Sequence, residues 1–147
     1  MIKLLLIFGP NINLMGSRDP SHYGDTPFDS LNQMILKYAS DNKVDIDIFQ
    51  SNYEGAIIDK IHEAKNWADG ILINPGAYVH YSYAIRDAIA AVKIPTIDVH
   101  ISNTYAREAF REKDVLAPVC QGIITGFGVN GIFLGIKGLF DIISKNK

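Results

Sequence analysis

The chain has 147 residues, of which 48% are hydrophobic and 20% are charged, and its formal net charge is −2. This length suits one domain over residues 1–147, the hydrophobic fraction supports a packed core, and the lack of a basic excess argues against a nucleic-acid binder. A single cysteine, Cys120, excludes an internal disulfide framework and a cysteine-based metal cluster.

Short apolar runs recur along the chain and have the length of β-strands that are buried on both faces. The first run, residues 2–8, is too short for a secretory signal, and no run reaches the length of a membrane span. We therefore expect a cytoplasmic protein that does not bind membranes. Runs of this kind are typical of parallel sheets, and the expected strands cover residues 2–8, 44–49, 70–73, 94–99 and 122–125.

Apolar residues at helical spacing fill the stretches between these runs. We expect helices over about 28–40, 54–68 and 81–92, an interrupted one after Asn103, and a last one after Asn130. This alternation predicts an α/β fold, a flavodoxin-like doubly wound sandwich with a five-stranded parallel sheet of order 2-1-3-4-5. Ligands bind such sheets beyond the carboxyl ends of the strands, which here means the loops 9–24, 74–80 and 98–103.

Asp98 and His100 stand two residues apart at the end of the fourth expected strand, so both side chains leave the same face. A carboxylate beside an imidazole fixes its orientation and favours its protonated form, which suits a general acid. Taken alone, such a pair is equally typical of a structural hydrogen bond. Its position at the expected switch point of the sheet favours the functional interpretation.

The loop over residues 16–24 is long for a connection inside a compact domain and is typical of an active-site lid. It contains Arg18 and Tyr23. A tyrosine is a poor base at neutral pH unless a neighbouring cation stabilises its phenolate, and a desolvated arginine can do so. From the loop alone, a packed tyrosine and a surface arginine are the simpler interpretation.

Other polar side chains follow the expected strands, and for each of them a solvated surface position is the default. Arg107 and Arg111 stand four residues apart, which would place them on one helix face where they could bind a carboxylate. The remaining candidates are His80, Arg86 and Asp87.

Two motifs do not indicate a cofactor. Residues 126–131 match the glycine pattern of dinucleotide-binding loops, but they follow the last expected strand, and the chain ends before the strand that would carry the ribose-binding acid. The histidines lack the spacing of a metal-binding helix, and Cys120 has no second cysteine. We therefore expect neither a metal nor a cofactor.

Blocks spread over nearly the whole chain form a specific combination: residues 9–20 with 23–24, 50–55, 73–78 with His80, 98–103, 106–111, 117–120 and 126–128. Together they resemble the signature of the type II 3-dehydroquinate dehydratases. The resemblance implies a lyase that dehydrates 3-dehydroquinate to 3-dehydroshikimate through an enolate, the third step of the shikimate pathway to chorismate and the aromatic amino acids. No lysine falls in a catalytic position of these blocks, so a Schiff base is not expected.

The resemblance also implies roles for individual residues. Tyr23 would accept the proton from C2, Arg18 would stabilise the phenolate and the transition state, and Asn11 would help to hold the enolate oxygen. His100, beside Asp98, would protonate the departing C1 hydroxyl. The substrate's hydroxyls and carboxylate would be bound by Asn74, His80, Asp87, Ile101, Ser102 and Arg111. Family members look like homo-dodecamers built from four trimers, in which Asp87 reaches a neighbour's site.

The sequence departs from the family pattern at three places. Asp98 stands where the family usually has Glu, and its shorter arm bears on how His100 is oriented. Tyr81 and Tyr83 replace smaller or more polar residues. Gly135 and Gly138 lie inside the last expected helix, where each costs about 0.5–1 kcal/mol relative to Ala, so that helix is expected to be short or closely packed.

Two other functions are compatible with the predicted fold. A flavodoxin-like module that binds a flavin or another phosphate-bearing ligand predicts a first loop rich in Ser, Thr and Gly, whereas residues 9–14 carry a proline and aliphatic residues. A catalytically inactive scaffold is disfavoured because every catalytic position is filled. The sequence fits a biosynthetic role and a quinate-degrading role equally well.

Overall fold

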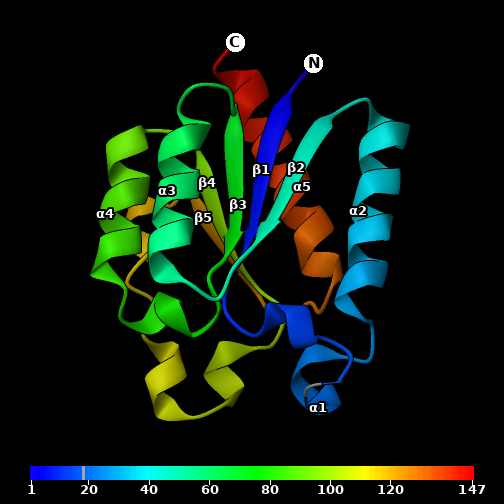
Figure 1. Cartoon of the computed structure of the whole chain (residues 1–147), viewed down its shortest axis with the longest axis vertical. Helices are drawn as coiled ribbons and strands as arrows, with labels where there is room; N and C mark the ends of the chain where they lie inside the picture. Colours follow the sequence, from blue (N-terminus) through cyan, green and yellow to red (C-terminus); the bar gives the residue numbers. More distant parts are fainter. Residues whose placement is uncertain (18) are drawn as a thin grey trace.

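The computed structural model describes residues 1–17 and 19–147. Its centre is a five-stranded parallel sheet in the order β2-β1-β3-β4-β5 (Figure 1), which confirms the predicted fold and strand order. The switch point of the sheet therefore lies between β1 and β3. The strands are β1 (Lys3–Phe8), β2 (Asp45–Gln50), β3 (Gly70–Asn74), β4 (Thr96–His100) and β5 (Gly122–Thr125).

Helices cover both faces of the sheet (Figure 1). One face packs against α2 (Phe28–Asn42) and α5 (Asn130–Lys145), and the other packs against α3 (Glu54–Ala64) and α4 (Tyr83–Val92). The short helix α1 (Pro20–Tyr23) lies in the connection between β1 and α2. Among the helices of residues 1–17 and 19–147, none is long and apolar enough to cross a membrane.

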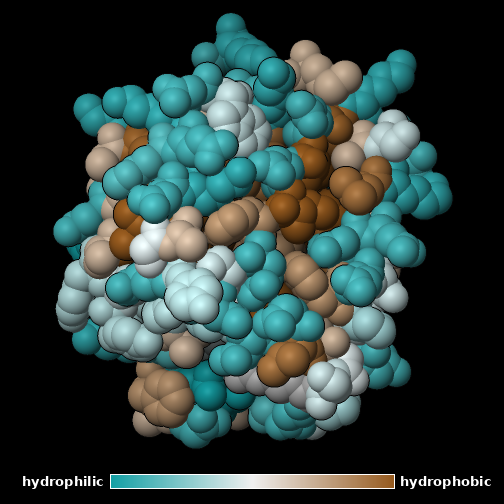
Figure 2. Space-filling model, in the orientation of Figure 1, coloured by the Kyte–Doolittle hydropathy of each residue, from teal (hydrophilic) through white to brown (hydrophobic). Residues whose placement is uncertain are grey.

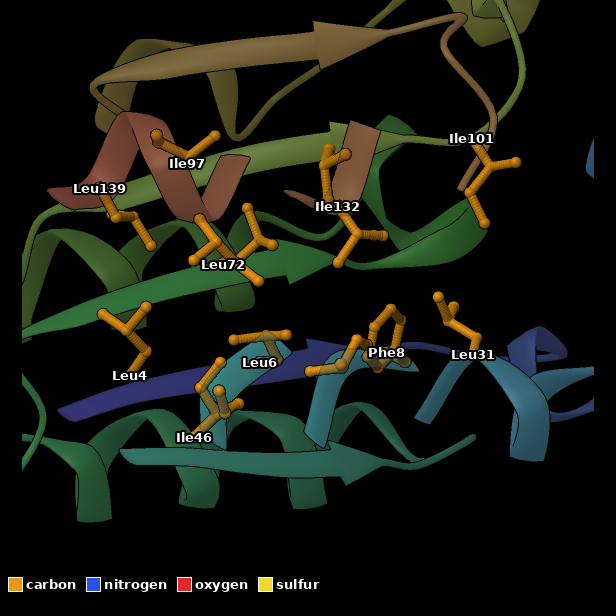
Figure 3. Close-up of a cluster of buried hydrophobic side chains, with 14 of the residues drawn as sticks. Leu4, Leu6, Phe8, Leu31, Ile46, Leu72, Ile97, Ile101, Ile132 and Leu139 are labelled. Atoms are coloured by element: carbon orange, nitrogen blue, oxygen red, sulfur yellow. The ribbon is translucent and has the colours of Figure 1, made fainter. Parts of the chain in front are cut away.

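The central strand β1 divides its side chains between the two layers because successive residues of a strand point to opposite faces. Leu4, Leu6 and Phe8 join the cluster beneath α2 and α5 (Figure 3), and Leu5 and Ile7 join the cluster beneath α3 and α4. All five are at most 1% exposed. Burying each such side chain contributes roughly 1.5–3 kcal/mol, so β1 is a rigid base for the loop that follows it.

The edge strand β2 is buried less completely than the strands at the centre. Its apolar residues Ile48 and Phe49 are half-buried. In the view of Figure 2 the surface is largely hydrophilic, and hydrophobic side chains gather beside α2 and over β2. The most deeply buried part of the sheet is therefore β1, β3 and β4, whose carboxyl ends carry the candidate site.

The last helix is closely packed and is not shortened by its glycines. α5 has 16 residues. A Cβ atom on Gly135 would lie 2.5 Å from Cδ1 of Leu72 in β3, and one on Gly138 would lie 3.0 Å from Cδ1 of Ile97 in β4. The two glycines therefore let α5 approach the sheet, which decides between the two alternatives that the sequence left open.

Two predicted helix boundaries were wrong by a few residues. The second predicted helix ends at Ala64 and not at residue 68, and the third begins at Tyr83 and not at residue 81. The later start follows from capping, because the hydroxyl of Ser82 accepts a hydrogen bond from the backbone N–H of Ile85 at 3.0 Å. Serine is among the residues that best begin a helix in this way.

The interrupted helix predicted after Asn103 is replaced by short 3-10 helices. Side chains compete here with helical backbone hydrogen bonds. Asn103 accepts from the backbone N–H of Tyr105, and Asp114 accepts from those of Leu116 and Ala117. The short helices are η3 (Thr104–Ala106), η4 (Ala109–Glu112) and η5 (Ala117–Val119).

The loops that follow β1 and β3 touch through their backbones. The N–H of Gly9 donates to the carbonyl oxygen of Asn74 at 2.7 Å. A Cβ atom on Gly9 would lie 2.4 Å from the carbonyl oxygen of Pro75, a contact that no L side chain can make. Glycine at this position therefore joins the two loops directly above the switch point.

Candidate active site

A pocket opens at the carboxyl ends of β1, β3 and β4, where the strand order predicted a ligand site. Its empty volume is about 440 Å³ with the open mouth included. The structure brings together in its lining the following residues predicted for the site: Asn11, Tyr23, Asn74, His80, His100, Ile101, Ser102 and Arg111.

The other predicted site residues lie elsewhere. Asp98 is fully buried and contacts His100 from behind the pocket. Asp87 is exposed on α4 and does not line this pocket, and its neighbour Arg86 is half-buried on the same helix. Arg18 lies outside the described residues.

Tyr23 is paired with Arg107, which also lines the pocket. Nη1 of Arg107 donates to the hydroxyl oxygen of Tyr23 at 2.7 Å and to Oγ of Ser102 at 3.2 Å. The guanidinium carbon lies 5.1 Å from the centre of the tyrosine ring, and the Arg107 side chain is 8% exposed. The guanidinium charge is thus held, largely desolvated, against the phenol.

The prediction that Arg107 and Arg111 share a helix face was wrong. Arg107 follows η3 and Arg111 lies in η4, so no continuous helix joins them. Both reach the pocket by the course of the loop. Nε of Arg111 donates to Oε2 of Glu108 at 2.9 Å. Residue spacing could not assign Arg107 to the tyrosine because the spacing rule assumes a helix that is absent here.

His100 lies between two carboxyl groups. Its Nε2 is 3.0 Å from Oδ2 of Asp98 and 3.5 Å from Oδ2 of Asp114. Burial opposes a charge on this ring, but hydrogen bonds and attraction from Asp114 and Asp98 outweigh burial and raise the pKa of His100 to about 9. The imidazole is therefore positively charged at neutral pH. The shorter arm of Asp98 still reaches the histidine.

Asp114 was missed by the sequence reasoning. Its capping role could have been predicted from the local sequence, because an aspartate placed two or three residues before a short helical turn can cap that turn. Its Oδ1 indeed accepts from the backbone N–H groups of Leu116 and Ala117, each at 2.9 Å. Its approach to His100 had no sequence signal, because it depends on the path of the segment between η4 and η5.

The group formed by Asp98, His100 and Asp114 has ligand atoms of the types that bind metals, all within 4.8 Å of one another. The histidine nitrogen faces both carboxyl groups at hydrogen-bonding and ion-pairing distances. We therefore interpret the group as a charged hydrogen-bond cluster and not as a set of metal ligands.

Asn11, Asn74 and His80 present polar groups to the pocket from fixed backbones. Asn11 adopts a left-handed conformation with φ of 68°, and its N–H donates to Oδ1 of Asn52 at 3.1 Å. Oδ1 of Asn74 accepts from the N–H of Gly76 at 3.2 Å. Nδ1 of His80 lies 2.7 Å from the carbonyl oxygen of Lys113. A carbonyl oxygen only accepts, so Nδ1 carries the hydrogen.

Comparison with known proteins gives one family. The family profile described as "Dehydroquinase class II" matches residues 2–140. A protein named 3-dehydroquinate dehydratase from Anoxybacillus flavithermus is 52% identical over 143 residues, which are 97% of this chain and 97% of that protein. One with the same name from Caldicellulosiruptor saccharolyticus is 53% identical over 144 residues, or 97% of this chain and 99% of that protein.

A solved structure with a similar fold is the type II dehydroquinase from Butyrivibrio crossotus. Its TM-score is 0.93 at 51% sequence identity, and the match covers 94% of this chain and 97% of that one. The two chains therefore share one fold over nearly their whole length.

Proposed function

We propose, from the premise that this chain belongs to the class II dehydroquinase family, that it is a lyase that dehydrates 3-dehydroquinate to 3-dehydroshikimate. The reaction belongs to the shikimate pathway. The observation that carries the proposal is that a tyrosine bound to a guanidinium and a charged histidine line the same pocket. These two groups supply the base and the acid that an elimination of water needs.

In the first step Tyr23, as a phenolate, removes a proton from C2, the carbon next to the ketone. The electron pair of the C–H bond becomes part of an enolate. The hydrogen bond from Arg107 supports this role, because a cation that donates to the phenol oxygen stabilises the anionic form. Arg18, which the family resemblance assigns to the same task, would add a second positive charge.

The enolate oxygen needs hydrogen-bond donors that are in place before the charge develops. Asn11 is the candidate for this task. It lines the pocket, and its left-handed backbone is fixed by the hydrogen bond from its N–H to Asn52. Because the N–H of Asn11 already donates to Asn52, the side-chain amide of Asn11 would be the donor to the enolate oxygen.

In the second step His100 donates a proton to the C1 hydroxyl, which leaves as water while the enolate collapses to the conjugated ketone. The raised pKa of His100 supports this role, because the ring carries its proton at neutral pH. Asp98 orients the ring through the contact at 3.0 Å. The cycle closes when the proton gained by Tyr23 is lost to solvent and His100 takes one up.

The remaining polar residues of the pocket would bind the substrate. Arg111 suits the carboxylate, since guanidinium and carboxylate groups match in a bidentate pair. The hydroxyl groups would be bound by Asn74, His80, Ser102 and the backbone of Ile101. Residues 16–24 would close over the substrate as a lid and exclude water during the reaction.

We further propose a homo-dodecamer of four trimers in the cytoplasm, in which Asp87 contributes to the site of a neighbouring subunit. The exposure of Asp87 on α4, away from the pocket of its own chain, supports this role. Light scattering during size-exclusion chromatography measures the assembly. A monomer with full activity would contradict the proposal.

The direct test is an ultraviolet assay for the conjugated ketone that forms from 3-dehydroquinate. We expect the wild type to turn over, and Tyr23→Phe and His100→Ala each to lose about 10²–10⁴-fold in kcat, the usual contribution of a general base or acid. Tyr38→Phe, a change of the same type on α2, is the control and should keep full activity.

Sodium borohydride tests the absence of a Schiff base. We expect borohydride and substrate together to leave the wild type active, because no lysine takes part. Inactivation with a lysine trapped on the substrate would contradict the mechanism, as would normal turnover by Tyr23→Phe.

A further inference from the structure

Two carboxyl groups approach the same nitrogen of His100, although one is enough to orient a ring. Nε2 lies 3.0 Å from Oδ2 of Asp98 and 3.5 Å from Oδ2 of Asp114. Asp98 comes from β4, the same strand as the histidine, whereas Asp114 comes from the segment between η4 and η5. The second contact therefore links the histidine to a different part of the chain.

From this geometry we infer that Asp114 is a positioning residue that holds His100 as a charged proton donor, an inference that rests on the proposed function. Both carboxyl groups occupy Nε2, and no residue of the described chain bonds to Nδ1. Because His100 lines the pocket, Nδ1 would be the nitrogen that delivers the proton to the substrate hydroxyl in this arrangement.

Asp114 is itself held rigidly. Its Oδ1 accepts from the N–H groups of Leu116 and Ala117, so only Oδ2 is directed at the histidine. The adjacent side chains of Val115 and Leu116 are 4% and 0% exposed, and the N–H of Val115 donates to the carbonyl oxygen of Val79 at 2.9 Å. The carboxylate therefore cannot turn away from the imidazole without losing these two hydrogen bonds, and its backbone is anchored by the buried neighbours.

The pKa values of the two carboxyl groups shift in opposite directions. Burial raises the pKa of Asp98 to about 7, although hydrogen bonding to His100 opposes this. Burial also acts on Asp114, but hydrogen bonds with His100 and Asp98 outweigh it and lower the pKa of Asp114 to about 2. Asp114, whose side chain is 16% exposed against 0% for Asp98, is therefore the carboxyl group that more readily carries the negative charge beside the imidazolium.

Other titratable groups surround the cluster and share its electrostatics. On the protein side, Cys120 lies near both carboxyl groups, and burial raises the pKa of its thiol, so it is neutral. On the pocket side the titratable and charged groups are Tyr23, His80, Arg107 and Arg111. The thiol is neutral and the arginines are cations, so apart from the phenolate proposed for Tyr23 the anions named here are the carboxyl groups of Asp98 and Asp114.

The substitution Asp114→Asn separates the charge of this residue from its capping role, because the amide oxygen can still accept from the two backbone N–H groups. We expect kcat to fall about 10-fold with little change in KM, less than the ~10²-fold or greater loss expected when the acid itself is removed. We also expect the alkaline limb of the kcat profile to move to lower pH. Asp114→Ser, whose hydroxyl can also cap, should behave in the same way if Asp114→Asn does not fold.

A nuclear magnetic resonance titration of His100 in the substrate-free protein tests the contact without any reaction. We expect a lower pKa for His100 in Asp114→Asn than in the wild type. Asp41→Asn removes the same charge from the exposed end of α2 and should leave this titration unchanged. Asp114→Glu, which restores the charge, should recover part of the raised value.

The positioning role of Asp114 and the proposed function are contradicted by different results. An unchanged His100 titration in folded Asp114→Asn would overturn the inference, whatever the activity. A shifted titration with an unchanged kcat profile would retain the contact with Asp114 but contradict the role of His100 as proton donor, and that role belongs to the proposed function.

Discussion

The hydroxyl oxygen of Tyr23 lies 2.7 Å from Nη1 of Arg107, although the two residues stand 84 positions apart in the sequence. One comes from the short helix after β1 and the other from the end of η3. The pairing places the positive charge of Arg107 beside Tyr23, the residue proposed as the base. It also places that charge in a side chain that is 8% exposed, where attraction is stronger than in water.

Replacing Arg107 by lysine keeps one positive charge but loses the planar group that donates to both Tyr23 and Ser102. We expect kcat for 3-dehydroquinate dehydration to fall by about 10²-fold, the loss typical of removing one fixed electrostatic donor. Arg86→Lys, on α4 and away from the pocket, is the matched control and should change neither kcat nor KM. A rise in KM at constant kcat would instead assign Arg107 to substrate binding.

The pH profile reports on His100. Since its pKa in the substrate-free protein is raised to about 9 and the protonated ring is the active form, kcat/KM should stay level through neutral pH and fall as pH rises through about 9. Asp98→Asn removes one of the partners that favour the charged ring, so the fall should begin at lower pH. An alkaline limb at the same pH in both proteins would contradict the assignment of His100 as the acid.

The stability of the fold should depend on Gly135 more than on other helical glycines. Gly135→Ala places a methyl group 2.5 Å from buried Leu72, and we expect a loss of roughly 1–3 kcal/mol in the free energy of unfolding. Gly55→Ala in α3 meets no atom within 4 Å and should stabilise the protein by about 0.4–1 kcal/mol. Urea denaturation measures both, and equal effects of the two changes would contradict the close packing of α5.

Mixing two inactive variants tests whether Asp87 acts across a subunit boundary. Asp87→Asn retains Tyr23, and Tyr23→Phe retains Asp87. If Asp87 serves a neighbour's site, co-refolded oligomers of the two variants contain some sites with both native residues, so their activity should exceed the sum of the separate activities. Activity equal to that sum would restrict Asp87 to its own subunit or remove it from the reaction.

The fold was predictable because its signals are local. The central strands are short apolar runs, and β1, which sends Leu4 and Leu6 to one layer and Leu5 and Ile7 to the other, has the composition typical of a doubly covered strand. The alternation of strands and helices gave the doubly wound class, and the strand order was chosen as the common one for five strands in that class. Helix ends were less accurate, since a single hydroxyl such as that of Ser82 decides where a helix begins.

The site was predictable in its location and only partly in its contacts. Asp98 and His100 share a strand, so their approach follows from the period of two residues. Tyr23 with Arg107 and His100 with Asp114 are joined by irregular segments, and no periodicity fixes the course of such segments. The family resemblance supplied candidates for these loops, and Asp114 was not among them.

The contact between Gly9 and Pro75 has a consequence for how this enzyme can vary. The separation between the first and third loops is set by two main chains in van der Waals contact, so it is independent of the side chains that line them. Substitutions can therefore accumulate on the surface helices without changing the width of the cleft. A single methyl group on residue 9 would force the loops apart, and Asn11 and Asn74 with them, in a protein whose hydrophobic layers were otherwise intact.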